Sequence, residues 1–150
     1  MSQPLCIYHG NCQDGFSAAW AVWTLNRDWE FYPGIYQTPP PDVKGRDVVI
    51  VDFCYKRPVL EEMTKSARSI LVLDHHKTAM EDLEGVPEPP ADLPDQRGWL
   101  PSFGLWATFD MERSGAGIAW DHFHFEDRPV LLNHVEDRDL WRSEERRVGK

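Results

Sequence analysis

The sequence is poor in cysteine. Three cysteines, Cys6, Cys12 and Cys54, occur in 150 residues, and no two of them have the Cys-x-x-Cys spacing. An odd number of cysteines cannot all pair, which argues against a disulfide framework. Thiols left reduced are typical of a reducing compartment, so we expect a cytoplasmic protein.

The sequence also lacks a long hydrophobic run and an excess of positive charge. No stretch approaches the length of a membrane span, and no basic segment followed by a long apolar one opens the chain, so neither insertion nor export is predicted. The net charge is −9, which argues against a broad surface for long nucleic acid because such binding depends on lysine and arginine contacts to phosphate. A small anionic substrate held by metal ions is compatible with this charge. The oligomeric state is left open.

What the sequence contains is ordinary for one globular domain. Hydrophobic residues make up 41% and charged residues 27% of a chain long enough for one core. We expect the domain to span residues 1–142. Within it, residues 81–101 are acidic and rich in proline, and we interpret them as a surface insertion, a solvated loop in preference to a lid. Residues 143–150 show no apolar period, and we expect an unstructured or foreign tail.

Three short apolar runs have the length and composition of buried parallel strands, and polar side chains follow each of them. The runs occupy residues 5–8, 48–51 and 70–73. In open α/β sheets, ligands bind outside the carboxyl ends of the strands. If these strands are neighbours, the following acids and imidazoles gather in one crevice: His9, Asp14, Asp52, Asp74, His75 and His76.

The remaining pattern predicts an α/β fold. Further strands are expected at residues 29–36 and 103–109, and helices at 14–26 and 57–67 and from 114 onwards. Apolar residues go nearly all the way round the helix at 14–26, so we expect it to be largely buried. We predict a three-layer α/β domain with a mainly parallel sheet, helices on both faces and the site at the carboxyl ends of the strands.

The polar residues at the strand ends suit metal-assisted hydrolysis. Mixed imidazole and carboxylate ligands are typical of manganese, iron or zinc sites. Carboxylates shared between ions are the usual means of holding two metals close together, and such pairs activate water for attack on phosphate esters.

Five motifs in this order resemble those of the DHH phosphoesterases, a family that includes single-strand exonucleases, short-oligonucleotide hydrolases and cyclic-dinucleotide phosphodiesterases. The resemblance covers roughly residues 5–142. The motifs are Tyr8-His9-Gly10-Asn11-Cys12-Gln13-Asp14-Gly15-Phe16, Val51-Asp52, Asp74-His75-His76, Ser114-Gly115-Ala116 and Glu136-Asp137-Arg138-Asp139-Leu140-Trp141.

The resemblance implies two metal ions, which we expect to be Mn²⁺, with Mg²⁺ or Co²⁺ as alternatives. The first ion takes His9 and Asp52. Asp52 bridges to the second ion, whose other ligands are Asp14, His75 and Asp137, with Asp139 as the rival of Asp137.

The resemblance also implies catalytic and substrate-binding residues. His76 faces the substrate phosphate as a hydrogen-bond donor or general acid, and Asp74 orients the histidines. We expect Ser114, Gly115 and Lys77 to bind the substrate, because free N–H groups at a helix start favour phosphate.

The activity implied is that of a metal-dependent phosphohydrolase. It would use a water activated by two metal ions to hydrolyse a small phosphodiester or phosphomonoester, such as a short oligonucleotide or a nucleotide. The family normally continues into a carboxyl-terminal substrate-binding domain. We expect the present chain to be the catalytic domain without it.

The first motif departs from the family pattern. Many relatives place two acids there, whereas the earlier position is Asn11, Cys12 or Gln13 in this sequence. Two alternatives therefore stay open. One is a catalytically impaired metal- or nucleotide-binding protein of the same fold, and the other is a mononuclear zinc site that uses Cys12 or Cys54 with histidine.

Overall fold

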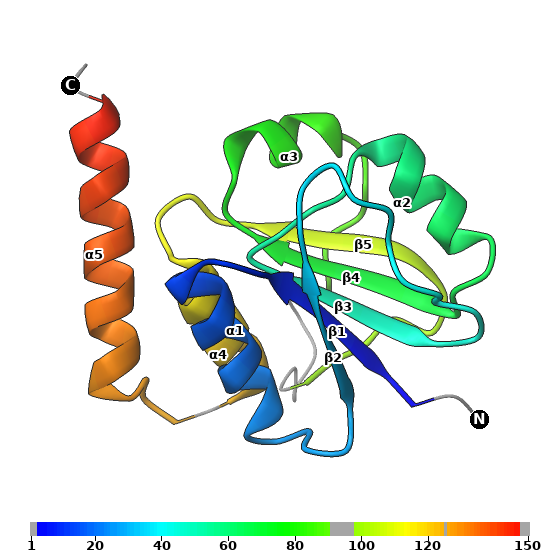
Figure 1. Cartoon of the computed structure of the whole chain (residues 1–150), viewed down its shortest axis with the longest axis horizontal. Coiled ribbons are helices and arrows are strands. Elements are labelled where there is room, and N and C mark those ends of the chain that lie inside the picture. Colours follow the sequence, from blue (N-terminus) through cyan, green and yellow to red (C-terminus); the bar gives the residue numbers. More distant parts are fainter. Residues whose placement is uncertain (1–2, 91–97, 125, 148–150) are drawn as a thin grey trace.

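Five parallel strands in the order β2-β1-β3-β4-β5 form the centre of the computed structural model (Figure 1). The structure describes residues 3–90, 98–124 and 126–147, with the backbone alone for residues 141–147. The strands are β1 (Leu5–His9), β2 (Glu30–Gly34), β3 (Asp47–Val51), β4 (Ser69–Asp74) and β5 (Gly104–Phe109).

Helices cover both faces of this sheet (Figure 1). Alternate strand residues face opposite ways, so that Cys6 and Val49 pack with α1 and α4 while Ile7 and Ile50 pack with α2. The predicted three-layer α/β architecture is confirmed, with every strand pair parallel. The helices are α1 (Gln13–Trp23), α2 (Arg57–Thr64), α3 (Lys77–Asp82), α4 (Gly115–Phe123) and α5 (Val130–Arg147).

The strand order reverses between β1 and β3. The chain leaves β1 for β2 on one side of it by way of α1, and β3 then pairs with the other side of β1. In register, Tyr8 lies beside Val51 and Val51 lies beside Leu73. The residues that follow these three are therefore level with one another at a topological switch point, the position where open α/β sheets bind ligands.

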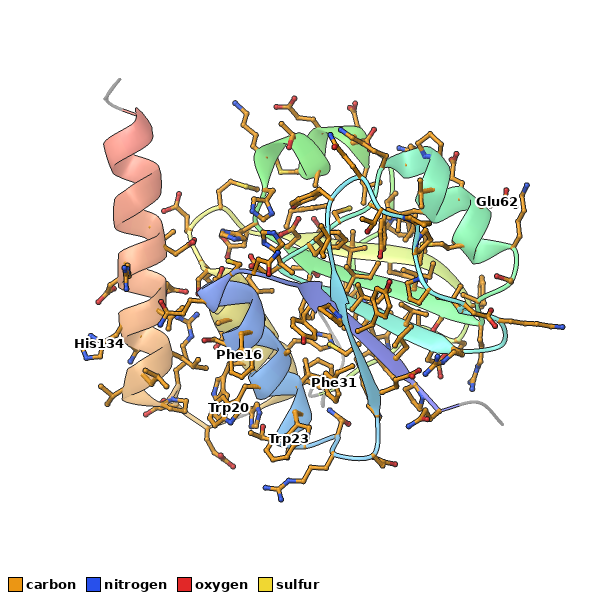
Figure 2. All side chains as sticks on the ribbon, in the orientation of Figure 1. Phe16, Trp20, Trp23, Phe31, Glu62 and His134 are labelled. Carbon is orange, nitrogen blue, oxygen red and sulfur yellow. The ribbon has the colours of Figure 1, made fainter. Side chains whose placement is uncertain are left out.

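The helix α1 is less buried than its composition predicted. Its small residues, such as Ala18 and Ala21, face inward, where they allow a close approach to α4. The bulky rings point the other way, and Phe16 is 68% exposed. Figure 2 shows Phe16, Trp20 and Trp23 on the outer side of α1, near Phe31 of β2. The expectation of a largely buried helix is confirmed for seven of its eleven residues, whereas the rings of Phe16, Trp20 and Trp23 leave one side of the helix exposed.

Two segments have more structure than the sequence suggested. In the insertion, Leu83 is buried, and Trp99 and Leu100 pack against the side of the core that α1 and α4 cover. The carbonyl oxygen of Pro87 accepts a hydrogen bond from Ala107 N in β5 at 3.0 Å. The described parts of this segment therefore close the β5 edge of the core, whereas residues 91–97 lie outside the described residues. At the other end, α5 stays helical to Arg147, five residues into the expected tail, and residues 148–150 lie outside the description.

The helix α5 lies beside α1 and α4 at one side of the domain (Figure 1). Its residues Leu132 and Val135 are buried in the core cluster on that side. Among the described residues, no helix combines the length and the apolar character needed to cross a membrane.

Candidate metal centre

Imidazoles, carboxylates and one thiol converge at the switch point. Most of them lie at the carboxyl ends of β1, β3 and β4 or directly after them, while α1 and α5 contribute one acid each. Within the part of the chain that the structure describes, three overlapping groups each place one ligand atom per residue within 4.8 Å of the others. The groups are His9, Cys12 and Asp52; Asp14, His75 and Asp139; and Asp52, Asp74, His75 and His76.

The carboxylate of Asp52 is the centre of this arrangement. It is 1% exposed, and its Oδ1 lies 2.8 Å from His75 Nε2 while its Oδ2 lies 3.7 Å from both His9 Nδ1 and Cys12 Sγ. The backbone of Asp52 has a φ of 54°, in the left-handed region that non-glycine residues rarely adopt. Backbone of this kind is concentrated at functional sites, where the surrounding structure holds it.

The start of α4 holds the second carboxylate of the site. Asp14 is 3% exposed and accepts hydrogen bonds from Gly115 N at 2.8 Å and Ala116 N at 2.9 Å. A glycine is required at position 115, because a Cβ there would lie only 2.5 Å from Asp52 Oδ1. The helix start therefore packs directly against both carboxylates.

This packing corrects the expectation that Ser114 and Gly115 bind a substrate phosphate. The N–H of Gly115 donates to Asp14, the N–H of Ser114 donates to Glu136 at 2.9 Å, and the Ser114 hydroxyl accepts from Gly117 N at 3.0 Å. These groups are engaged inside the protein, so the helix start stabilises a ligand carboxylate instead of an external anion. Glu136, to which the sequence analysis assigned no role although it opens the last motif, is held in place by Arg128 at 2.7 Å.

The third substrate-binding candidate, Lys77, is not brought to the cluster. Its side chain is 76% exposed, with Nζ 4.0 Å from Glu81 on the same helix. It lies at the first position of α3, next to His76 in the chain, but it makes none of the contacts of the site.

The structure places Asp139, and not Asp137, beside His75. Asp139 is half-buried with its Oδ2 3.6 Å from His75 Nδ1, whereas Asp137 is exposed. Residues two apart on an α-helix point about 200° apart, so only one of the two can face the cluster. The order of preference given to these acids from the sequence is therefore reversed.

His76 and Asp74 form a separate pair at the edge of the cluster. Asp74 is completely buried, and its Oδ1 lies 2.7 Å from His76 Nδ1. The His76 ring is 38% exposed and lines a pocket of about 620 Å³. This position fits the predicted division of roles, in which Asp74 orients a histidine that faces the substrate.

Of the residues in the first motif that were considered as ligands, Cys12 lies at the candidate metal site, whereas the presence of Asn11 is explained by its backbone conformation. Asn11 is exposed and has a φ of 60°, a conformation that asparagine tolerates better than most residues. Cys54 belongs to none of the three groups, and its thiol donates to Tyr55 O at 3.2 Å. Of the two cysteines considered from the sequence, the structure brings only Cys12 to the site.

The buried carboxylates strongly favour positive charge on the groups around them. Burial, reinforced by the neighbouring Asp52, raises the pKa of Asp14 to about 6 although His75 opposes this shift. Burial lowers the pKa of His75, but Asp14 and Asp52 outweigh it and raise the value to about 11. Asp52 and the Cys12 thiol raise the pKa of His9 to about 10. The two histidines thus carry positive charge where a metal ion would supply it.

The donor set and its spacing fit metal ions. His9 Nδ1 is buried and has no hydrogen-bond partner among the described residues. Its separation of 3.7 Å from Asp52 Oδ2 is too long for a hydrogen bond. Ligands bonded at about 2.0–2.3 Å around a tetrahedral ion lie roughly 3.3–3.8 Å from one another. The residues present therefore fit one ion at His9, Cys12 and Asp52 and a second at Asp14, His75 and Asp139, with Asp52 Oδ1 2.8 Å from His75 Nε2.

A pocket adjoins the centre on the side of α2 and α3. Tyr36, Thr38, Tyr55 and Lys56 line it together with His76. The Tyr36 ring also lies edge-on to His9, with 5.2 Å between the ring centroids. No motif marks these residues, because they come from two loops whose meeting depends on the fold.

Comparisons with known proteins leave the function open. The chain is 31% identical over 154 aligned residues to an uncharacterized protein of Acanthamoeba polyphaga mimivirus. The alignment covers 90% of this chain and 32% of the viral protein, so the chain spans about a third of the length of this relative. No protein-family model matches the sequence, and no solved structure matches it.

Proposed function

We propose that this protein is a metal-dependent phosphoesterase of the DHH type, which hydrolyses a small phosphodiester or phosphomonoester such as a short oligonucleotide or a nucleotide. One observation carries the proposal. The buried Asp52 carboxylate lies between two groups of metal ligands at the switch point of a parallel sheet. A carboxylate shared between two ions is the usual means of holding them close together, as two-metal phosphate hydrolysis requires.

The ligands divide between two ions. His9, Cys12 and Asp52 would hold the first ion, and Asp14, His75 and Asp139 the second. Asp52, whose Oδ1 lies 2.8 Å from His75 Nε2, would bridge to the second ion. When bound, the ions lower the pKa of a water molecule towards neutrality and neutralise the charge that grows on the phosphoryl oxygens.

The pair formed by His76 and Asp74 would move the proton. Burial lowers the pKa of His76, but the Asp74 carboxylate outweighs it and raises the value, which favours the imidazolium form. With Nδ1 held by Asp74 at 2.7 Å, the proton on Nε2 is available to the leaving oxygen of the substrate. Asp74 stabilises the charged ring and fixes its orientation.

The pocket beside His76 would take the organic part of the substrate. Its volume of about 620 Å³ lies within the usual range for small-molecule sites, and the rings of Tyr36 and Tyr55 offer flat apolar surfaces to a base or sugar. The net charge of −9 leaves little positive surface to follow a long phosphate backbone. We therefore expect two-to-five-residue oligonucleotides to be preferred over long single strands.

A competition assay tests this proposal. The metal-free protein is reconstituted with Mn²⁺, and hydrolysis of a labelled dinucleotide is followed with rising amounts of unlabelled dinucleotide or long single-stranded DNA at moderate salt. We expect turnover that chelation abolishes and weak competition by the long strand. Unchanged turnover after exhaustive chelation would refute the metal dependence, and stronger competition by the long strand would refute the preference for short substrates. Binding of Mn²⁺ and nucleotide without turnover would favour the impaired binding protein.

A further inference from the structure

The geometry points to Cys12 as a thiolate ligand of the first metal site, which makes that site selective for a softer ion, Zn²⁺ or Fe²⁺, beside a second site that suits Mn²⁺. This inference rests on the proposed function for the existence of two sites. It adds that the two ions differ, and it names the residue that distinguishes them.

The backbone position of Cys12 does not account for the presence of a cysteine. Cys12 is the N-cap of α1, where serine, threonine, asparagine and aspartate are preferred because their oxygens accept from the first N–H groups. The Cys12 side chain makes no such capping bond. Its Sγ is instead directed to Asp52 Oδ2, at 3.7 Å.

Cys12, His9 and Asp52 together have the composition of a catalytic zinc-type site. They offer one sulfur, one nitrogen and one oxygen ligand within 4.8 Å of one another. Three protein ligands are typical of catalytic zinc sites, which keep a further position for water or substrate. A cysteine that binds a metal does so as the thiolate, a soft ligand that favours zinc and iron over manganese and magnesium.

The second site has no sulfur. Asp14, His75 and Asp139 offer carboxylate and imidazole atoms only. The other two cysteines do not alter this difference, because Cys6 is completely buried in the core and the Cys54 thiol donates to Tyr55 O. A single side chain in the first motif therefore separates the ion preferences of two adjacent sites.

Cobalt(II) absorption tests the inference without relying on activity. The metal-free protein is titrated with Co²⁺, and equilibrium dialysis counts the bound ions. A thiolate bound to Co²⁺ gives an intense charge-transfer band in the near ultraviolet, whereas carboxylate and imidazole ligands do not. We expect this band in the wild-type protein at one equivalent of thiolate-bound Co²⁺. We expect it to persist in Cys54→Ser, which is the matched control, and to disappear in Cys12→Ser.

A second substitution tests the selectivity. Cys12→Asp replaces the sulfur by a hard oxygen ligand, and we expect its preference for Zn²⁺ over Mn²⁺ at the first site to fall at least about tenfold. Circular dichroism verifies that each variant is folded. If a variant does not fold, the wild-type spectrum still decides, because bound Co²⁺ without the band overturns the inference. Persistence of the band in Cys12→Ser, or its loss in Cys54→Ser, overturns it too. If the protein binds two ions without a thiolate and hydrolyses its substrate, the proposed function stands and only the inference about Cys12 is wrong. If it binds no ion, both the proposed function and this inference are wrong.

Discussion

The imidazole of His75 lies with its Nε2 2.8 Å from Oδ1 of Asp52. This contact joins the ends of β4 and β3, and both residues are almost fully buried. Because Asp52 also belongs to the group of His9 and Cys12, a change at this carboxylate affects both halves of the candidate centre.

Asp52→Asn is expected to disturb both metal positions. Loss of the shared carboxylate should reduce the bound metal per chain and lower any hydrolysis by more than about 100-fold. In the metal-free protein, the pKa of His9 should fall towards its ordinary value, which NMR titration measures directly. Asp47→Asn, at the other end of β3, is the control, because Asp47 contacts Ser69 and Arg68 and no residue of the centre. Equal metal loss in both variants would contradict the assignment.

Asp139→Asn and Asp137→Asn separate the two acids of the last motif. We expect the change at Asp139 to weaken the binding of the second ion by about 10-fold or more, because this side chain lies beside His75. The change at Asp137 removes the same charge from an exposed position on α5 and should leave affinity nearly unchanged. Isothermal titration with Mn²⁺ measures both, and the reverse order would restore the original preference for Asp137.

We expect the His76→Ala variant to keep its bound metal but to hydrolyse the substrate more slowly. The ring is bonded to Asp74 and faces the pocket, so its removal should lower turnover by about 10²–10⁴-fold while leaving the metal content nearly intact. Elemental analysis alongside steady-state kinetics measures both quantities. Loss of an ion in this variant would show that the roles of His75 and His76 are exchanged.

Metal binding should release protons. The pKa values of His9 and His75 are raised to about 10 and about 11, so both are protonated at neutral pH and must become neutral to bind an ion. The apparent affinity for Mn²⁺ should therefore rise with pH between about 6 and about 9, and titration in weak buffer should record the released protons. An affinity independent of pH would contradict this account.

The same groups affect the stability of the metal-free protein. Their folded pKa values lie above the unfolded value of about 6.5. Their contribution is therefore fully present below that pH and is lost as pH rises through about 10 and about 11. Thermal unfolding of the metal-free protein should accordingly show a lower midpoint in alkaline solution, and added Mn²⁺ should offset this loss.

The architecture was predictable from the sequence because its signals are local. Three apolar runs of four residues each identify buried strands, and the residue after each run must lie at the strand end. When such strands are parallel neighbours in the sheet, the residues at their carboxyl ends lie side by side, as the register of Tyr8, Val51 and Leu73 shows. The sequence could not establish that order by itself, but it named every strand end that the structure brings together.

The predictions that the structure corrected concern features that depend on tertiary contacts. The choice between Asp137 and Asp139 depends on how α5 is rotated against the sheet, which no short motif fixes. The N–H groups of Ser114 and Gly115 looked free because their partners, Glu136 and Asp14, are distant in the chain. The exposed face of α1 has the same origin, since apolar content alone does not say which side meets α4.

The number of metal ions bound per chain decides whether Asp52 joins two metal sites. The metal-free protein is dialysed against Mn²⁺ and Zn²⁺ together, freed of loosely bound ions and analysed by mass spectrometry of the elements, with Asp52→Asn and Asp47→Asn beside it. We expect a total of two ions per wild-type chain, the same total in Asp47→Asn, and clearly less than two in Asp52→Asn. A single ion per wild-type chain, or a total that Asp52→Asn leaves unchanged, would contradict a centre built on a shared Asp52.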